Sequence, residues 1–214
     1  MTFLVVIIGW IFSLCLHEFS HALVAYRGGD YTVREKGYLT FNPLKYTHPV
    51  YSILVPVIFL LMGGIGLPGG AVYIEKWRLR SRNWVSAVSL AGPLSNLLLA
   101  VVLSVIISLA PDTSGGIWPG LAFLALLQVM ALVLNMIPLP PLDGYGVIEP
   151  FLSASTREMF DRTRGYMVFI IFLVLWYVPA VSNLFWGLIG TVANLVGIPM
   201  DLAFFGYDQF LFWR

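Results

Sequence analysis

The sequence predicts an all-α polytopic membrane protein with about five to six transmembrane or re-entrant helices and a short β-strand or hairpin element. Of its 214 residues, 59% are hydrophobic and only 11% are charged, which is far more apolar than a soluble domain. Several apolar runs are long enough to cross a hydrocarbon core of about 30 Å. These runs lie near residues 3–26, 50–74, 85–110, 119–139 and 166–206. No linker or soluble unit interrupts them, so we expect a single domain over residues 1–214.

The first apolar run contains a compact polar cluster, His17, Glu18 and His21. An ionisable group at the centre of a membrane helix costs roughly 2.5–3.5 kcal/mol on insertion scales, so the cluster needs a compensating partner. Residues i and i+4 share one helix face, so both histidines can bind one metal ion. Glu18 lies one step round the helix and can reach a water on that ion. This H-E-x-x-H pattern is typical of zinc hydrolases. A chance match, or histidines satisfied by neighbouring helices, is the weaker interpretation.

Basic residues follow the first, second and fourth runs, whereas residues 111–118 contain neither lysine nor arginine. The positive-inside rule therefore places the three basic loops in the cytoplasm, and residues 111–118 and the N-terminus outside. Both flanks of residues 50–74 are then on one side. Because this run is rich in proline and glycine, we expect it to be re-entrant, with a tilted transmembrane helix as the alternative.

Two short segments beside the second run have the pattern of strands. Tyr38, Thr40 and Asn42 alternate before Pro43, and residues 71–74 could form a second strand near the candidate site. His48 lies among polar residues and is interpreted as a solvated loop residue, with metal contact as the lesser alternative.

Two later runs contain the remaining polar positions of interest. Small residues at 91, 92 and 95 predict a close approach of another helix, and Asn96 should hydrogen-bond across the bundle, with a supporting role near the metal as one option. Asp143 follows three prolines on irregular backbone and reaches the inner half of the membrane, as His17 does. Asp143 is therefore the candidate third ligand. Asp201 is the competitor, with a helix cap as its other interpretation.

The last apolar stretch, from residue 166 to about 206, is long enough for two crossings with a break near residues 179–183. The single cysteine, Cys15, excludes an internal disulfide and a thiolate zinc cluster. A net charge of +1 and the lack of a basic stripe give no indication of nucleic-acid binding.

With these residues identified, the sequence resembles the site-2 protease family of intramembrane zinc metalloproteases, and in particular its compact prokaryotic members without PDZ or CBS domains. The matching motifs are H-E-F-S-H from residue 17, F-N-P-L-K from 41, L-A-G-P-L-S-N from 90 and N-M-I-P-L-P-P-L-D-G from 135. The resemblance implies that His17, His21 and Asp143 bind Zn²⁺, that Glu18 is the catalytic base and that Asn135 helps to bind the scissile carbonyl. Residues 69–75 lack the Lys-Pro expected of the family at that strand.

The resemblance also implies a function. The protein would hydrolyse peptide bonds within transmembrane segments of single-pass membrane proteins or their remnants, as in regulated intramembrane proteolysis. We expect it in a prokaryotic inner membrane with its active site in the cytoplasmic half of the bilayer. The alternative is a metal-ion transporter or channel that uses the His/Asp cluster as a transit site, although the paired discontinuous helices of many transporters are not evident.

Overall fold

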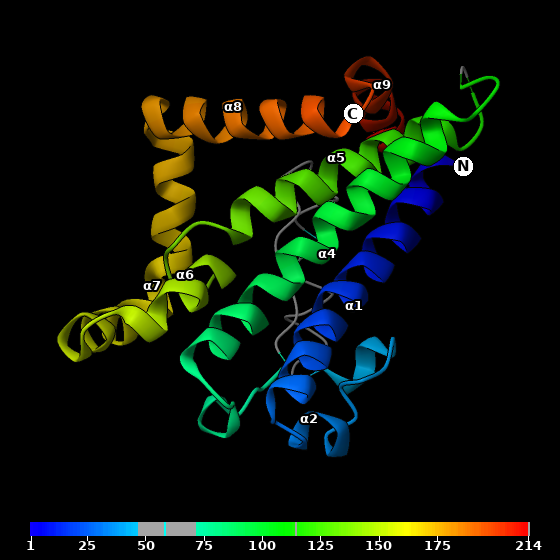
Figure 1. Cartoon of the computed structure of the whole chain (residues 1–214). Helices are drawn as coiled ribbons and strands as arrows, with labels where there is room; N and C mark the ends of the chain where they lie inside the picture. The colour runs from blue at the N-terminus through cyan, green and yellow to red at the C-terminus, as the bar shows by residue number, and fades with distance from the viewer. Residues whose placement is uncertain (47–57, 59–71, 114, 214) are drawn as a thin grey trace.

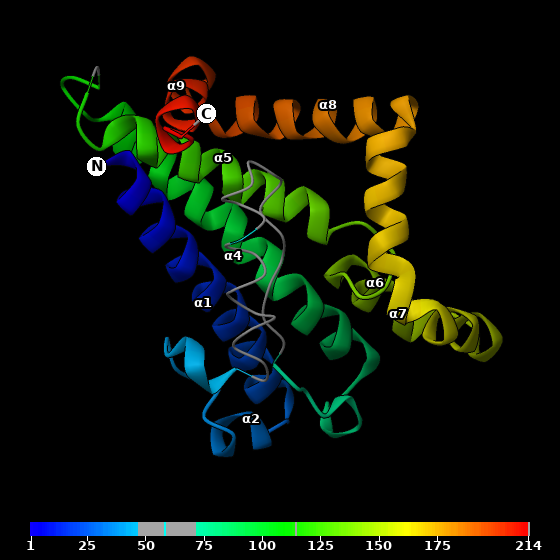
Figure 2. The same ribbon diagram turned by 180° about the vertical axis from the view of Figure 1, so that it is seen from behind.

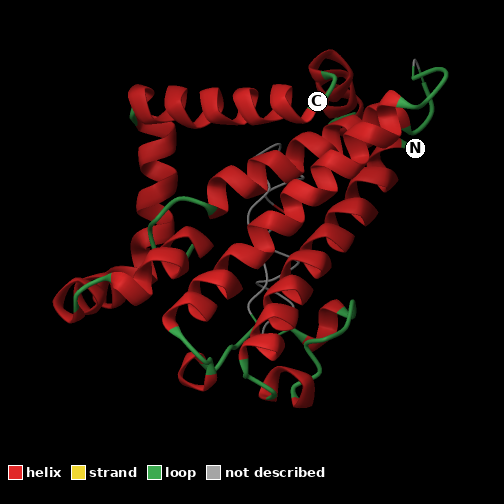
Figure 3. Ribbon diagram, in the orientation of Figure 1, coloured by secondary structure: helices red, strands yellow, loops and turns green. Residues whose placement is uncertain are grey.

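A computed structural model of the chain describes residues 1–46, 58, 72–113 and 115–213, and the regular structure within this part is helical (Figure 1; Figure 3). The α-helices are α1 (Thr2–Gly28), α2 (Thr32–Glu35), α4 (Arg82–Ser108), α5 (Trp118–Asn135), α6 (Asp143–Ile148), α7 (Ala154–Tyr177), α8 (Pro179–Val196) and α9 (Met200–Phe210). Short 3₁₀ helices are η1 (Pro43–Lys45), η3 (Lys76–Arg78) and η4 (Glu149–Phe151).

The centre of the protein is a layer of three long helices. In both views α1, α4 and α5 run side by side, with α4 between the other two over much of their length (Figure 1; Figure 2). Most residues of α5 are buried, and the fully buried side chains of Trp10 and Leu127 belong to the same apolar core. Helix α9 packs against α5 near the N-terminus of the chain. These packed helices bring side chains that are distant in the sequence close together.

Four helices in the described part are long and apolar enough to cross a membrane, namely α1, α4, α5 and α8. The sequence predicted five to six crossing or re-entrant helices. Helix α7 falls short because five charged residues lie in its first half, at 157, 158, 161, 162 and 164, and only its second half is apolar. The predicted break in the last stretch lies at Val178, where α7 ends and Pro179 begins α8. Most of the predicted re-entrant run 50–74, together with His48, lies outside the described residues.

The predicted strand at residues 38–42 is wrong, because this segment consists of bends and irregular backbone. Side-chain hydrogen bonds hold it in place of a strand ladder. The Tyr46 hydroxyl lies 2.7 Å from the carbonyl oxygen of Thr40 and 3.1 Å from that of Cys15, so its single hydrogen is shared between these two acceptors. Asn42 caps η1 by accepting from the Leu44 N–H at 3.0 Å. Residues 72–75 have no regular structure either, so no hairpin forms within the described part of the chain.

The buried carboxylate of Asp30 holds residues 72–75 beside the end of α1 by a hydrogen bond. Helix α1 is capped by Gly29, whose φ of 117° is in the left-handed region that glycine tolerates best. The next residue, Asp30, has no exposed surface. It accepts hydrogen bonds from the N–H and hydroxyl of Thr32 and from the Glu75 N–H, the last at 2.8 Å. This contact joins the segment after residue 71 to the first helix.

Candidate metal centre

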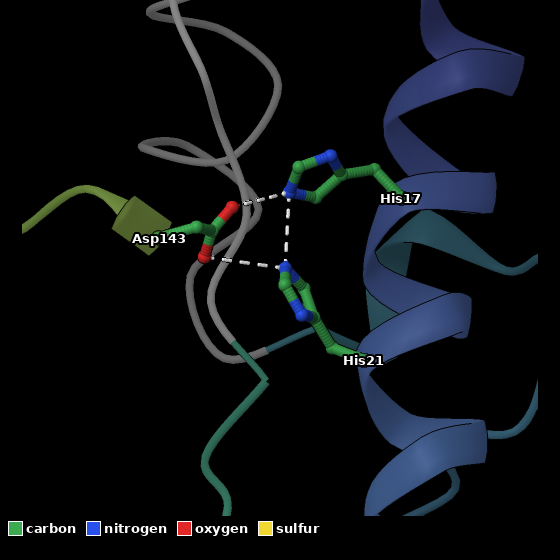
Figure 4. A group of neighbouring side chains, drawn as sticks. All are labelled: His17, His21 and Asp143. Atoms are coloured by element: carbon green, nitrogen blue, oxygen red, sulfur yellow. Dashed lines mark hydrogen bonds and ion pairs between the residues drawn. The ribbon is translucent and has the colours of Figure 1, made fainter. Parts of the chain in front are cut away.

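Helix α1 presents two imidazoles from its central part. His17 and His21 lie one turn apart on the same face, and their Nε2 atoms are 3.0 Å apart (Figure 4). Both side chains are buried. The predicted juxtaposition of these two histidines is therefore present in the fold.

Asp143 reaches the same point from a segment more than 120 residues later in the chain. After α5 ends, irregular backbone leads to α6, and Asp143 is its first residue. Its Oδ2 lies 3.1 Å from Nε2 of His17 and its Oδ1 lies 3.4 Å from Nε2 of His21 (Figure 4). The competing carboxylate, Asp201, is instead exposed in the first turn of α9. The structure thus unites the three residues that the sequence selected as candidate ligands.

The spacing of these atoms suits a small tetrahedral metal ion. One ligand atom from each of the three residues can be chosen so that all three lie within 4.8 Å of one another. Ligands about 2.0–2.1 Å from a tetrahedral zinc ion are roughly 3.4 Å apart. The two Nε2 atoms are 3.0 Å apart, and each has a different oxygen of Asp143 at a similar distance, 3.1 Å for His17 and 3.4 Å for His21. Two imidazole nitrogens and a carboxylate also form a donor set that catalytic zinc sites use, with one position left for water.

A backbone carbonyl determines which nitrogen of His21 is free. Its Nδ1 lies 2.6 Å from the carbonyl oxygen of Val88, and because a carbonyl can only accept, Nδ1 carries the hydrogen. Neutral His21 therefore directs the lone pair of Nε2 at Asp143 and His17. A cation between these groups would relieve the repulsion of lone pairs and carboxylate oxygens, so the residues present fit a bound zinc ion.

Helix α4 approaches the two histidines at a glycine, Gly92. A Cβ at Gly92 would stand 2.6 Å from Cε1 of His17 and still closer to Nε2 of both histidines. The small residue thus lets α4 touch the imidazoles directly, as the run of small residues predicted. The site therefore lies between α1, α4 and the start of α6.

Glu18 lies beside this cluster and borders an adjacent cleft. Its side chain is buried, and Oε2 accepts a hydrogen bond from the Val72 N–H at 3.1 Å. The cleft has a volume of about 320 Å³. Its lining includes Glu18, His21, Asp143, the segment 72–74 and the cationic side chains of Lys76 and Arg164. The cleft therefore brings two of the three candidate ligands, the Glu18 carboxylate and the irregular backbone of residues 72–74 together.

Two polar residues outside the ligand set extend the centre into the bundle. Asn96 hydrogen-bonds across the bundle as predicted, and its Oδ1 lies 2.6 Å from Nδ1 of His17. Gln128 was not predicted to take part. Its side-chain oxygen accepts a hydrogen bond from the Asn96 amide, and the residue has no exposed surface. A lone glutamine inside a very apolar helix was the available signal. Asn135 is buried at the end of α5 and is not among the residues that line the cleft, so its predicted role stays a prediction.

Comparison with known proteins decides the family. The model of peptidase family M50 matches residues 3–114 of this chain. The chain belongs to peptidase family M50. A protein of Mycolicibacterium smegmatis named as a zinc metalloprotease, Rip2, is 45% identical over 99% of this chain and 81% of its own length. The Rip2 zinc metalloprotease of Mycobacterium tuberculosis H37Rv is 42% identical with the same coverage.

A more distant relative in Bacillus subtilis, named as the zinc metalloprotease YwhC, is 34% identical over 84% of this chain and 83% of its own length. No solved structure matches the chain significantly. The predicted site-2 protease resemblance is confirmed, and with it the prediction of a zinc-dependent peptidase. As an M50 peptidase with four helices able to cross a membrane, the protein is a multi-pass membrane protein.

Proposed function

We propose that this M50 peptidase hydrolyses peptide bonds of membrane-protein segments at the centre formed by His17, His21 and Asp143. These three residues would hold zinc, which supplies Lewis-acid activation of a water molecule and of the peptide carbonyl. The observation that supports this most is the convergence of two imidazoles from α1 and one carboxylate from α6 at tetrahedral spacing. The transporter alternative is not supported by the relatives found.

Glu18 would act as the general base. It is one residue beyond His17, so it lies off the face that carries the ligands but next to it. The Val72 N–H holds one carboxylate oxygen, which limits the orientations of the side chain. In the proposed reaction Glu18 removes a proton from the attacking water and then delivers it to the nitrogen of the leaving amine. Asn135 would help to stabilise the negative charge on the carbonyl oxygen, a role that rests on the family resemblance.

The segment 72–74 is the proposed docking edge for the substrate. A helical substrate must unwind locally, because its carbonyl groups are hydrogen-bonded within the helix and shielded by side chains. An unwound stretch could pair with backbone groups of residues 72–74, which line the cleft next to Glu18. The other predicted docking edge, at residues 36–42, contains a turn and bends and is less suited to this pairing.

The cytoplasmic half of a prokaryotic inner membrane is the proposed place of cleavage. His17 lies 15 residues into α1, about 22 Å from its start at 1.5 Å per residue. His17 is therefore nearer to the C-terminal end of α1. That end carries Arg27 and is followed by the basic residues before α4. The positive-inside rule assigns that end to the cytoplasm. Substrates would be single-pass proteins or remnants whose transmembrane segment reaches this depth, and the whole of residues 1–214 would act as one domain.

The proposal is tested by separating metal binding from catalysis. Glu18→Gln should keep one zinc per chain and abolish cleavage of a single-pass reporter in proteoliposomes. His17→Ala and Asp143→Ala should lose both zinc and cleavage. Cleavage by Glu18→Gln at the wild-type rate would contradict the role of the carboxylate, and full zinc content in both ligand variants would contradict the assignment of the centre.

A further inference from the structure

A hydrogen-bonded chain connects the candidate metal centre with the interior of α5. Gln128 on α5 accepts from the side-chain N–H of Asn96 on α4 at 2.9 Å. Oδ1 of Asn96 in turn lies 2.6 Å from Nδ1 of His17 on α1. All three side chains are buried, and Gln128 has no exposed surface. The chain therefore crosses three helices inside an apolar core.

The direction of this chain determines which nitrogen of His17 is free to bind a metal. With Oδ1 of Asn96 facing the ring, Nδ1 of His17 donates its hydrogen and the lone pair of Nε2 points towards Asp143. If the Asn96 amide were reversed, its N–H would face Nδ1, the hydrogen would move to Nε2 and the metal position would be blocked. The orientation of the Asn96 amide thus determines the tautomer of His17. That orientation depends in turn on the group that faces the other end of Asn96.

The side-chain oxygen of Gln128 faces the other end of the Asn96 amide and accepts its N–H. Nε2 of Gln128, in contrast, is buried and has no hydrogen-bond partner within the described residues. Leaving a buried amide nitrogen unpaired is costly, so the conformation with Oε1 towards Asn96 requires a compensating gain. A metal-competent His17 provides such a gain, because groups behind a metal-bound histidine fix its tautomer and ring orientation.

We propose that Gln128 is a positioning residue for the zinc centre. By accepting from Asn96 it turns Oδ1 of Asn96 towards His17 and leaves Nε2 of His17 free for the ion. This inference rests on the proposed function, since it requires His17 to be a ligand. Gln128 is not one of the candidate ligands, and it lies on α5, whereas both histidines lie on α1.

The test measures zinc affinity of the purified full-length protein by competition with a chelator, and does not depend on turnover. Gln128→Met, which is similar in size and removes the acceptor, should weaken zinc binding about tenfold, the lower end of the usual effect of such outer groups. Gln128→Glu keeps an acceptor oxygen and should stay within about threefold of the wild type. Ser104→Ala is the control, because it removes a different hydrogen bond of α4, to the carbonyl of Gly197. Its zinc affinity should not change.

A second background separates positioning from a general structural role. Asp at position 96 accepts from Nδ1 of His17 in any orientation, so in Asn96→Asp the additional Gln128→Met change should no longer weaken zinc binding. The inference is overturned if Gln128→Met is folded and binds zinc as the wild type does. It is also overturned if Gln128→Glu loses as much affinity, or if the loss persists in the Asn96→Asp background. Loss of zinc in His17→Ala together with normal affinity in Gln128→Met would reject this inference alone and leave the proposed function intact.

Discussion

Gly92→Ala is the smallest change that should dismantle the candidate metal centre. The new methyl group would stand 2.6 Å from Cε1 of His17 and still closer to both Nε2 atoms, whereas ordinary contacts begin at 3.4 Å, so α4 and the imidazoles must separate by at least about 0.8 Å. Metal sites tolerate deviations of only about 0.2 Å in ligand distance. Changes to outer groups that leave the ligands in place already cost 10–100-fold in metal affinity, so we expect a loss of more than about 100-fold here.

Chelator competition on the purified protein measures this loss directly. Gly187→Ala is the matched control, because apart from the neighbouring residues and the backbone of α8 itself no described atom lies within 4 Å of a Cβ at that position. Replacing glycine by alanine in an open helix position should stabilise the helix by roughly 0.5–1 kcal/mol and leave zinc affinity unchanged. Wild-type zinc affinity in Gly92→Ala would refute the close packing of α4 against the two histidines.

Three further predictions follow from described contacts. Gly144→Ala should also lower zinc content and proteolysis, since its Cβ would stand 2.5 Å from the carbonyl carbon of Met136; normal zinc content would contradict this. Asp30→Ala should lower the free energy of unfolding by about 1–3 kcal/mol in a denaturant titration, because the Glu75 N–H loses its buried acceptor; an unchanged midpoint would contradict it. Hydrogen bonding to Arg78 holds the pKa of Glu75 below its usual value, so its stabilising contribution is complete above about pH 4.3 and is lost as the pH falls further. The stability difference between wild type and Glu75→Gln should therefore shrink below about pH 4, and a constant difference would contradict this reading.

Helical spacing and membrane depth were sufficient to select the three candidate ligands that the structure brings together. His17 and His21 share a helix face by arithmetic alone, and Asp143 was selected because irregular backbone brings a carboxylate into the inner half of the membrane. The structure places all three together. Asn96 could be expected to bond across the bundle, but its partners could not be named, because they lie on two other helices.

The parts that the sequence could not predict depend on side-chain packing. Alternation over residues 38–42 is too short to distinguish a strand from a segment held by the Tyr46 hydroxyl. Gln128 gave only the weak signal of an isolated amide in an apolar helix. Helix α7 was counted within an apolar stretch, although its charged first half leaves too few apolar residues for a full crossing.

Zinc K-edge X-ray absorption on the purified protein tests the central claim most directly. A centre formed by His17, His21 and Asp143 predicts about one zinc ion per chain, bound by nitrogen and oxygen at about 2.0–2.1 Å, with the scattering pattern of two imidazoles and no sulfur. The imidazole signal should disappear in His17→Ala/His21→Ala. A sulfur ligand from Cys15, or a zinc ion with no imidazole in the wild type, would contradict the proposed centre.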